Sequence, residues 1–239
     1  MKSIKRAVLA ALVACAGFSA AMAQTPEAAI RKNLAERLPQ MPKIEEISKT
    51  PLPGIFEVRV GTDLYYTDAE GNYLFQGQLI DTRLQRNLTE ERMEKLLAID
   101  FAALPVKDAF TIVRGNGKRK LAVFEDPNCP YCKNFERDLQ KVDNITIYMF
   151  LYPILGPDSA DKSRNLWCAK EPGKAWLDWM LRSQPPATAK CDTAALARNV
   201  EFGKKHKING TPTLVFFNGS RVPGAINAQQ VEKYLADAK

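Results

Sequence analysis

The sequence predicts two unlike domains in series, a small α+β domain with an antiparallel sheet and a larger α/β domain, joined by a helix. Residues 55–80 form short alternating stretches separated by turns, as half-buried strands do. Residues 89–103 carry apolar side chains at helical spacing. Residues 120–151 follow the order strand, helix, strand, which indicates a βαβ unit.

Residues 1–23 have the layout of an export signal. A basic start precedes an apolar stretch over residues 7–18, and a small-residue cleavage site ends it. We expect cleavage after Ala23 and a secreted mature protein. The basic residues at the start are Lys2, Lys5 and Arg6, and the cleavage site is Ala21-Met22-Ala23.

The same segment holds a second processing signal. Leu12-Val13-Ala14-Cys15 resembles the lipobox of bacterial lipoproteins, at which Cys15 would be acylated. The apolar stretch continues past Cys15 to the Ala23 site, which favours cleavage there, and the lipobox stays open as the alternative.

The overall charge argues against a nucleic-acid partner. The chain has a formal charge of +7, and residues 1–23 contribute three of these charges, so the mature part carries +4. It has no arginine-rich run. No stretch approaches the roughly 18 apolar residues of a membrane span, so we expect a soluble mature protein.

Residues 24–84 form the predicted N-terminal domain. A unit of this size buries little surface, so its fold is marginal alone. Pairing a sheet edge with a second copy would stabilise it, and a solitary compact domain is the alternative. The expected elements are a helix over 26–38, strands over 55–60, 64–67 and 73–80, and a turn over 68–72.

Residues 85–105 form the predicted linker, with a helix over 89–103. Thr89 is the expected N-cap, and Glu90 and Glu91 place negative charge at the positive end of the helix dipole. Pro105 ends the segment.

Residues 106–239 form the predicted α/β domain. Two apolar stretches flank a helix that begins near Cys129, and a long helical region separates this βαβ unit from a closing hairpin and helix. The expected elements are strands over 120–124, 145–151 and 213–217, a mostly helical region over 158–207, a return strand from 221 and a helix over 229–239.

The chemistry is predicted at Cys129-Pro130-Tyr131-Cys132. A C-x-x-C that follows a strand and opens a helix is typical of a thioredoxin-like redox motif. Cys129 at the helix N-terminus would be held as the thiolate, which is the nucleophile in disulfide exchange. Cys132, one turn on, can attack the resulting mixed disulfide. Pro130 suits the first helical turn.

Two other uses of this motif are a zinc site and an inert structural disulfide. Structural zinc needs four Cys or His ligands, but the chain has one histidine, His206, and no second C-x-x-C. An inert structural disulfide closing so short a loop would constrain the unfolded chain little. We therefore expect redox use, no metal and no cofactor. His206 lies among lysines and is expected at the surface, with no catalytic role.

The remaining cysteines of the mature chain are Cys168 and Cys191. Four cysteines allow three pairings, and proximity favours Cys129–Cys132 with Cys168–Cys191. Closing the second loop would stabilise the fold by roughly 3 kcal/mol in the chain-entropy picture. We interpret that pair as structural. Thr211-Pro212, before the last core strand, is a candidate cis-proline, and its isomer stays open.

Four runs of the sequence carry a resemblance to a known family: Phe124 to Lys133, Leu166 to Lys170, Gly210 to Thr213 and Asn218 to Gly224. Together they resemble the DsbC/DsbG family of bacterial periplasmic disulfide isomerases over nearly the whole mature length. Pro130 is more like DsbG, whereas the Cys168 and Cys191 region is more like DsbC, and the larger region favours the DsbC side.

The resemblance implies a cystatin-like dimerisation domain and a thioredoxin-like fold with a helical insertion. It implies a homodimer that reshuffles non-native disulfides in misfolded exported proteins, kept reduced by a DsbD-type membrane reductase in the periplasm. Cys129 would be the nucleophile and Cys132 the resolving cysteine, and Thr211-Pro212 would be a substrate-binding cis-proline loop.

Three other functions are compatible with the sequence. A dithiol oxidase would hold Cys129 and Cys132 oxidised in cells. A chaperone-like client binder would act without either cysteine. A DsbG-like reductase would act on oxidised single cysteines of dedicated clients.

Overall fold

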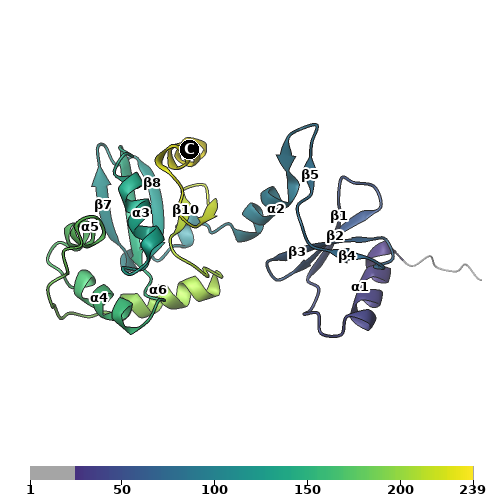
Figure 1. Cartoon of the computed structure of the whole chain (residues 1–239), viewed down its shortest axis with the longest axis horizontal. Helices are drawn as coiled ribbons and strands as arrows, with labels where there is room; N and C mark the ends of the chain where they lie inside the picture. Colours follow the sequence, from purple (N-terminus) through teal and green to yellow (C-terminus); the bar gives the residue numbers. More distant parts are fainter. Residues whose placement is uncertain (1–24, 239) are drawn as a thin grey trace, which may run out of the picture. The chain divides into compact units, whose positions relative to one another are not determined.

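The computed structural model describes residues 25–238, which divide into two compact units, residues 25–76 and residues 77–238. Each unit is coloured along the chain in Figure 1. The export signal and the lipobox alternative lie outside the described residues. No helix within residues 25–238 is long and apolar enough to cross a membrane.

The N-terminal unit is a four-stranded antiparallel sheet with one helix, which confirms the predicted α+β class. The strand order is β1-β2-β3-β4, so β1 and β4 are its edges. Ile30 and Leu34 of the helix pack on Val58 and Val60 of the sheet to form the core. The elements are α1 (Pro26–Arg37), β1 (Glu46–Lys49), β2 (Ile55–Val60), β3 (Asp63–Asp68) and β4 (Leu74–Phe75).

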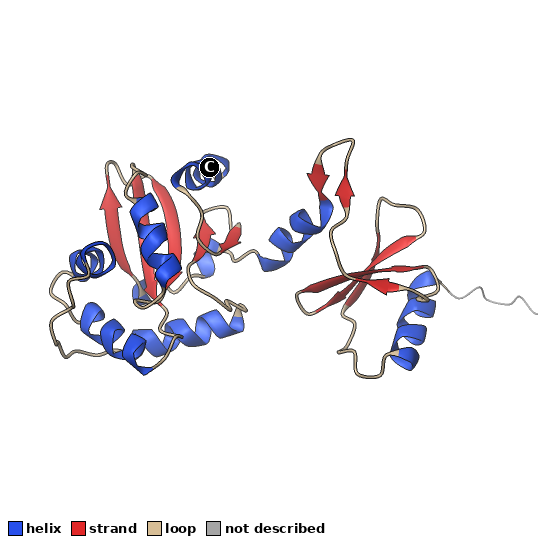
Figure 2. Ribbon diagram, in the orientation of Figure 1, coloured by secondary structure: helices blue, strands red, loops and turns tan. Residues whose placement is uncertain are grey.

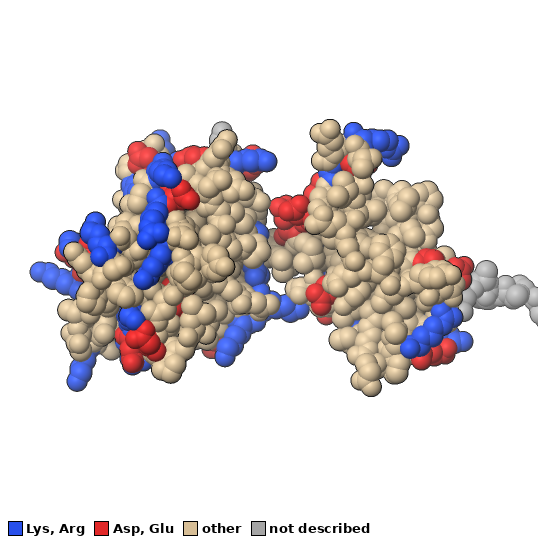
Figure 3. All heavy atoms as spheres, in the orientation of Figure 1, with Lys and Arg blue, Asp and Glu red and all other residues tan. Residues whose placement is uncertain are grey.

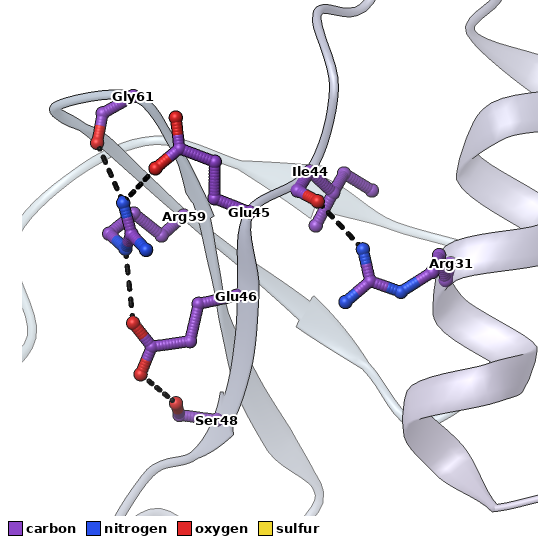
Figure 4. Close-up of polar contacts among 7 residues, drawn as sticks. All are labelled: Arg31, Ile44, Glu45, Glu46, Ser48, Arg59 and Gly61. Atoms are coloured by element: carbon purple, nitrogen blue, oxygen red, sulfur yellow. Dashed lines mark hydrogen bonds and ion pairs between the residues drawn. The ribbon is translucent and has the colours of Figure 1, made fainter.

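The two sheet edges of this unit differ in character. Beside β1, the Arg59 guanidinium bridges the Glu45 and Glu46 carboxylates, as Figure 4 shows. At β4, Tyr73 and Phe75 are 76% and 50% exposed. Charges on an edge strand oppose pairing with another strand, whereas exposed apolar side chains do not.

The sequence prediction was wrong at two places in this region. Strand β1 was not predicted, because only one of its residues, Ile47, is apolar. The predicted strand over 73–80 is interrupted: β4 ends at Phe75, and Ile80 pairs instead with Asn87 in a separate hairpin of the second unit. Gly77 and Gln78, between these two strands, are exposed, and neither supplies an apolar side chain that would continue the alternating pattern.

The linker helix of the second unit is shorter than predicted and starts earlier. It spans Leu88–Leu97, and Asn87, not Thr89, is its N-cap: the Asn87 side chain accepts a hydrogen bond from the Glu90 N–H at 3.1 Å. The Thr89 hydroxyl oxygen accepts from the Leu79 N–H instead. This helix is α2, and the hairpin before it is β5 (Ile80–Asp81) with β6 (Arg86–Asn87).

The second unit is built on a five-stranded mixed sheet in the order β11-β10-β8-β9-β7. Strands β8 and β9 are parallel and joined by α3, which confirms the predicted βαβ unit. Strand β7 was not predicted; it pairs antiparallel with β9, a contact between segments distant in sequence. The strands are β7 (Phe110–Arg114), β8 (Arg119–Glu125), β9 (Ile145–Leu151), β10 (Thr213–Phe216) and β11 (Arg221–Pro223).

Helices cover both faces of this sheet, as Figure 2 shows. Side chains alternate along β8, so Leu121 and Val123 pack toward α3, whereas Ala122 and Phe124 pack toward the opposite cluster with Phe101 and Phe202. The predicted helical region resolves into three helices, α4 (Pro157–Trp167), α5 (Pro172–Arg182) and α6 (Ala194–Lys205). The helix of the βαβ unit is α3 (Pro130–Leu139), and the closing helix is α7 (Ala228–Asp237).

Candidate active site

The two C-x-x-C cysteines lie where β8 turns into α3. Cys129 is the N-cap of α3, and Pro130 is its first residue. Cys129 is 3% exposed and Cys132 is fully buried, and both are free thiols. The helix N-terminus directs unpaired N–H groups at the Cys129 sulfur, which favours negative charge there.

Three contacts of Cys129 favour its ionised form. The Cys132 side chain contributes most, and the backbone N–H of Cys132 also donates to the Cys129 Sγ at 3.3 Å. The Thr211 side chain is the third contact that lowers the pKa, whereas the Thr211 carbonyl oxygen, 3.2 Å from Sγ, can only accept a hydrogen bond from the protonated thiol. Together the three favourable contacts outweigh desolvation and lower the pKa of Cys129 to about 6. Cys129 is therefore mostly thiolate at neutral pH.

Cys132 is electrostatically the opposite of Cys129. Burial raises the pKa of the Cys132 thiol well above its usual range, and the nearby Glu125 carboxyl adds to the shift. A thiol with so high a pKa is a poor nucleophile until its proton is removed. The site thus holds one activated sulfur and one that is inactive at rest.

Thr211 and Pro212 face this pair across the unit. The Thr211–Pro212 peptide bond is cis, and Pro212 is buried at the entrance to β10. The Thr211 carbonyl is the group that reaches the Cys129 sulfur. Residues 82 positions apart in sequence therefore form one site.

The surroundings of Cys129 combine exposed apolar side chains with basic ones. Tyr131 is 67% exposed, and Leu155, on the loop before α4, is 55% exposed. The Lys133 ammonium lies 4.4 Å from the centre of the Trp179 ring. In the view of Figure 3, basic side chains form a row on the second unit. In the sequence, Lys133 and Arg137 of α3 and Lys141 just after it recur every four residues.

Asp126 fixes the turn that carries Cys129, and its role was not recognised in the sequence. The side chain is fully buried. Its Oδ1 accepts from the Asn128 N–H and the Ser159 hydroxyl, and its Oδ2 accepts from the N–H groups of Ile154 and Leu155. Four donors from three segments satisfy the buried carboxylate. In the sequence, Asp126 is part of a cluster that predicts only a turn.

Two further acidic residues lie beneath the site. Glu125 ends β8 and Glu136 lies in the middle of α3, and both are fully buried. Burial raises the pKa of both carboxyls, that of Glu125 well above its usual range. The sequence signal for Glu125 is a carboxylate directly after four apolar residues, Leu121 to Phe124, and the sequence prediction assigned it to the turn.

Cys168 and Cys191 form a disulfide with a Cα–Cα distance of 5.5 Å. The bond joins the C-terminal end of α4 to the segment before α6. His206 lies at the end of α6, half-buried and stacked on Phe202 at 4.2 Å between ring centres. Within residues 25–238 no group of three or more His, Cys, Asp or Glu side chains could hold a metal ion.

An activated cysteine and a buried one, at the N-terminus of a helix in a βαβ unit and beside a cis-proline, define a thiol–disulfide oxidoreductase of the thioredoxin fold. Residues 106–239 match the thioredoxin-like domain family, and residues 21–90 match the family described as the disulfide bond isomerase protein N-terminal domain.

Curated relatives extend over both domains. The probable thiol:disulfide interchange protein DsbC of Bordetella pertussis is 45% identical over 216 residues, covering 90% of this chain and 76% of the relative. The thiol:disulfide interchange protein DsbC of Escherichia coli K12 is 29% identical, covering 94% and 92%. The chain therefore belongs to the DsbC family of thiol:disulfide interchange proteins.

A solved structure agrees with this assignment over part of the chain. The crystal structure of a disulfide interchange protein from Neisseria gonorrhoeae is 40% identical, with a TM-score of 0.54. The match covers 56% of this chain and 98% of that one.

Proposed function

We propose that this protein is a periplasmic disulfide isomerase that reshuffles non-native disulfides of exported proteins through a mixed disulfide at Cys129. The observation that carries the proposal is the difference between the two cysteines: Cys129 has a pKa of about 6, and Cys132 is buried with a raised pKa. An isomerase needs a ready nucleophile and a delayed resolving thiol.

The reaction begins with the Cys129 thiolate attacking one sulfur of a client disulfide. The client S–S bond breaks, a Cys129–client disulfide forms, and the other client sulfur leaves as a thiolate. A second client thiolate can then attack the mixed disulfide, releasing Cys129 as thiolate and completing isomerisation. Alternatively, Cys132 attacks Cys129, so the client is reduced and the enzyme pair is oxidised.

The oxidised pair requires an electron donor to return to the active form. We propose a DsbD-type membrane reductase, which would deliver two electrons by the same exchange chemistry. We also propose a homodimer joined through the N-terminal units, because the exposed apolar edge at β4 can pair with a second copy.

The exposed Tyr131 and Leu155 side chains suit the unfolded clients that such an enzyme meets. Both lie on segments tied to the Cys129 turn, Leu155 through the Asp126 carboxylate. We expect them to contact apolar client segments while Cys129 reacts, so chaperone-like binding accompanies the thiol chemistry.

Reactivation of scrambled ribonuclease tests the proposed function. Wild-type protein is expected to restore ribonuclease activity, and Cys129→Ala to lose nearly all of it, because no mixed disulfide can form. Cys132→Ala retains the nucleophile and should keep part of the isomerase activity. If Cys129→Ala reactivated ribonuclease at the wild-type rate, the proposal would be contradicted. If thiol alkylation showed Cys129 and Cys132 to be oxidised in cells, the protein would be an oxidase.

A further inference from the structure

The segment that places Thr211 beside Cys129 is anchored through its backbone carbonyl groups. This segment, the Thr211 loop, spans residues 206–212 between the end of α6 and the start of β10. A loop has no helical or sheet ladder, so the hydrogen bonds of its carbonyls determine where it lies. Five carbonyls of the loop accept hydrogen bonds from residues outside it: those of His206, Lys207, Ile208, Gly210 and Pro212.

Arg221, the first residue of β11, binds the beginning of the loop. Its guanidinium donates from Nη1 to the His206 carbonyl and from Nη2 to the Lys207 carbonyl, both at 2.7 Å. The residue after the strand, Gly224, binds the end of the loop, since its N–H donates to the Pro212 carbonyl at 2.8 Å. Both ends of the loop are therefore tied to β11 and the residue that follows it.

The charge of Arg221 is unusual for a side chain that is buried this deeply, because the residue is only 5% exposed. Burial lowers the pKa of Arg221, and the Tyr152 phenol is the only other ionisable group that acts on it among the described residues. The Arg221 Nε has no hydrogen-bond partner within residues 25–238. A buried cation without a carboxylate partner costs free energy, and here the carbonyls at the negative end of the α6 dipole offset that cost.

Tyr152, the residue that follows β9, binds the next carbonyl of the loop. Its side chain is buried, and its hydroxyl donates to the Ile208 carbonyl at 2.9 Å. A Cβ atom on Gly203 of α6 would lie 2.4 to 2.5 Å from atoms of the Tyr152 side chain, so the helix can approach the ring this closely only with glycine there. Two buried side chains thus hold three consecutive carbonyls of the loop.

We propose that Arg221 and Tyr152 are positioning residues for thiol–disulfide exchange at Cys129. They fix the Thr211 loop so that it contacts both the Cys129 sulfur and the peptide backbone of a client bound to that sulfur. Neither side chain is among the contacts of the Cys129 sulfur, so both act through the loop. The inference rests on the proposed function, since it is a client that the loop would bind.

A loop without these anchors should affect the reaction in two ways. A peptide client would be oriented less well, and a misplacement of about 1 Å can slow a reaction by up to about a hundredfold. The Thr211 contact that lowers the pKa of Cys129 would also weaken. The other groups that act on Cys129 stay in place, because they lie on α3 and β8: Tyr131, Cys132 and Glu125.

The test compares a peptide disulfide with a disulfide that has no peptide group. Reduced full-length protein reacts at pH 8 with a disulfide-linked dimer of a single-cysteine peptide or with 2-hydroxyethyl disulfide. Mass spectrometry after acid quenching follows the loss of the reduced protein. Iodoacetamide alkylation between pH 4 and pH 9 gives the inflection of Cys129. The variants are Arg221→Met, Arg221→Lys and Tyr152→Phe, and the control is Arg198→Met.

Arg198 is a matched control because it lies on α6 and its guanidinium also donates two hydrogen bonds. Both go to the carboxylate of the buried Asp108, at 2.9 and 2.7 Å, and neither involves the Thr211 loop. Arg198→Met therefore loses as many hydrogen bonds as Arg221→Met and also leaves a buried polar group unpaired. It reports what the fold alone contributes.

In Arg221→Met, the reaction with the peptide disulfide should slow at least about tenfold. The reaction with 2-hydroxyethyl disulfide should stay within about threefold of wild type, because the Cys129 thiolate predominates at pH 8 in every variant. The alkylation inflection should move to higher pH. Arg221→Lys should lie between Arg221→Met and wild type, because its ammonium can still donate to a carbonyl.

Tyr152→Phe removes one hydroxyl and should slow only the peptide reaction, by about threefold. Arg198→Met should keep the wild-type ratio of the two rates and the wild-type inflection.

Three outcomes overturn the proposal. One is a wild-type ratio of the two rates in Arg221→Met, whether both rates are unchanged or both fall equally. Another is an equal change of this ratio in Arg198→Met. If Arg221→Met does not fold, wild-type peptide rates in both Arg221→Lys and Tyr152→Phe are the third. Failure of the wild-type protein to react with the peptide disulfide would instead contradict the proposed function.

Discussion

Cys129 and Cys132 are three residues apart and both buried, yet their pKa values are shifted in opposite directions. The helix N-terminus and the Thr211 side chain lower the pKa of Cys129, whereas deeper burial and Glu125 raise that of Cys132. The motif alone predicts which of the two cysteines is the more acidic, because the first cysteine of such a motif lies at the helix N-terminus. The size of the difference depends mainly on the burial of Cys132, to which Glu125, predicted in a turn, adds.

The lowered pKa of Cys129 predicts the pH dependence of its alkylation. Because the thiolate reacts and its pKa is about 6, the rate with iodoacetamide should fall about tenfold from pH 7 to pH 5. Mass spectrometry of the Cys129 adduct measures this. Cys132→Ala removes the largest contribution to the shift, so its inflection should move to higher pH. An inflection of wild type near the ordinary cysteine value would contradict the expectation.

Replacing Asp126 should destabilise the fold and loosen the turn that carries Cys129. Asp126→Ala leaves four buried or half-buried donors without their acceptor, which costs about 3 kcal/mol in free energy of unfolding. Urea denaturation measures the loss. Asp158→Asn is the matched control, because its side chain is 70% exposed and the change should stay within about 0.5 kcal/mol. Equal effects of the two variants would argue against the role of Asp126.

At the scale of elements, the sequence predicted those with strong local signals. Strand β2 has its predicted bounds, Ile55–Val60, because its apolar and charged residues alternate. Strand β7 was missed although its residues are compatible with a strand, because β9, its only partner among residues 25–238, lies more than 30 residues away. Helix α2 was misplaced at its start because Asn87 and Thr89 are both good caps, and tertiary contacts decide between them.

The N-cap assignment of α2 predicts different effects for these two residues. Asn87→Ala should weaken the first turn of α2 by about 1 kcal/mol, because the Glu90 N–H loses its acceptor. Hydrogen exchange at Glu90 should then be about fivefold faster. Thr89→Ala should instead expose the Leu79 N–H, with little change at Glu90. If exchange at Glu90 were faster in Thr89→Ala and unchanged in Asn87→Ala, Thr89 would be the N-cap instead.

At the scale of the whole molecule, the sequence predicts the order of the two domains. It does not predict which edge of the small sheet is charged and which is apolar. Composition and periodicity locate a small sheet domain before an α/β domain. Which edge of the small sheet is charged depends on the register that brings Arg59 to Glu45 and Glu46 across the β1–β2 pair, and no local pattern gives that register. In Figure 3 most of the visible face of the N-terminal unit carries no charged side chain.

The exposed apolar edge at β4 predicts how the proposed homodimer can be broken. Phe75 is 50% exposed beside a strand that has no partner on its outer side within the described residues, so a carboxylate there would be buried at a dimer interface. Phe75→Asp should therefore have the mass of one chain in light scattering, at concentrations where wild type has the mass of two.

The monomer separates thiol chemistry from isomerisation. Cys129 lies in the other unit, so its alkylation rate should be unchanged in Phe75→Asp, whereas scrambled-ribonuclease reactivation should fall because one catalytic unit alone does not enclose a client. Leu52→Asp is the control, since Leu52 is 49% exposed in the turn between β1 and β2, away from β4. A dimeric Phe75→Asp protein, or a Leu52→Asp protein that dissociates equally, would place the interface elsewhere on the unit.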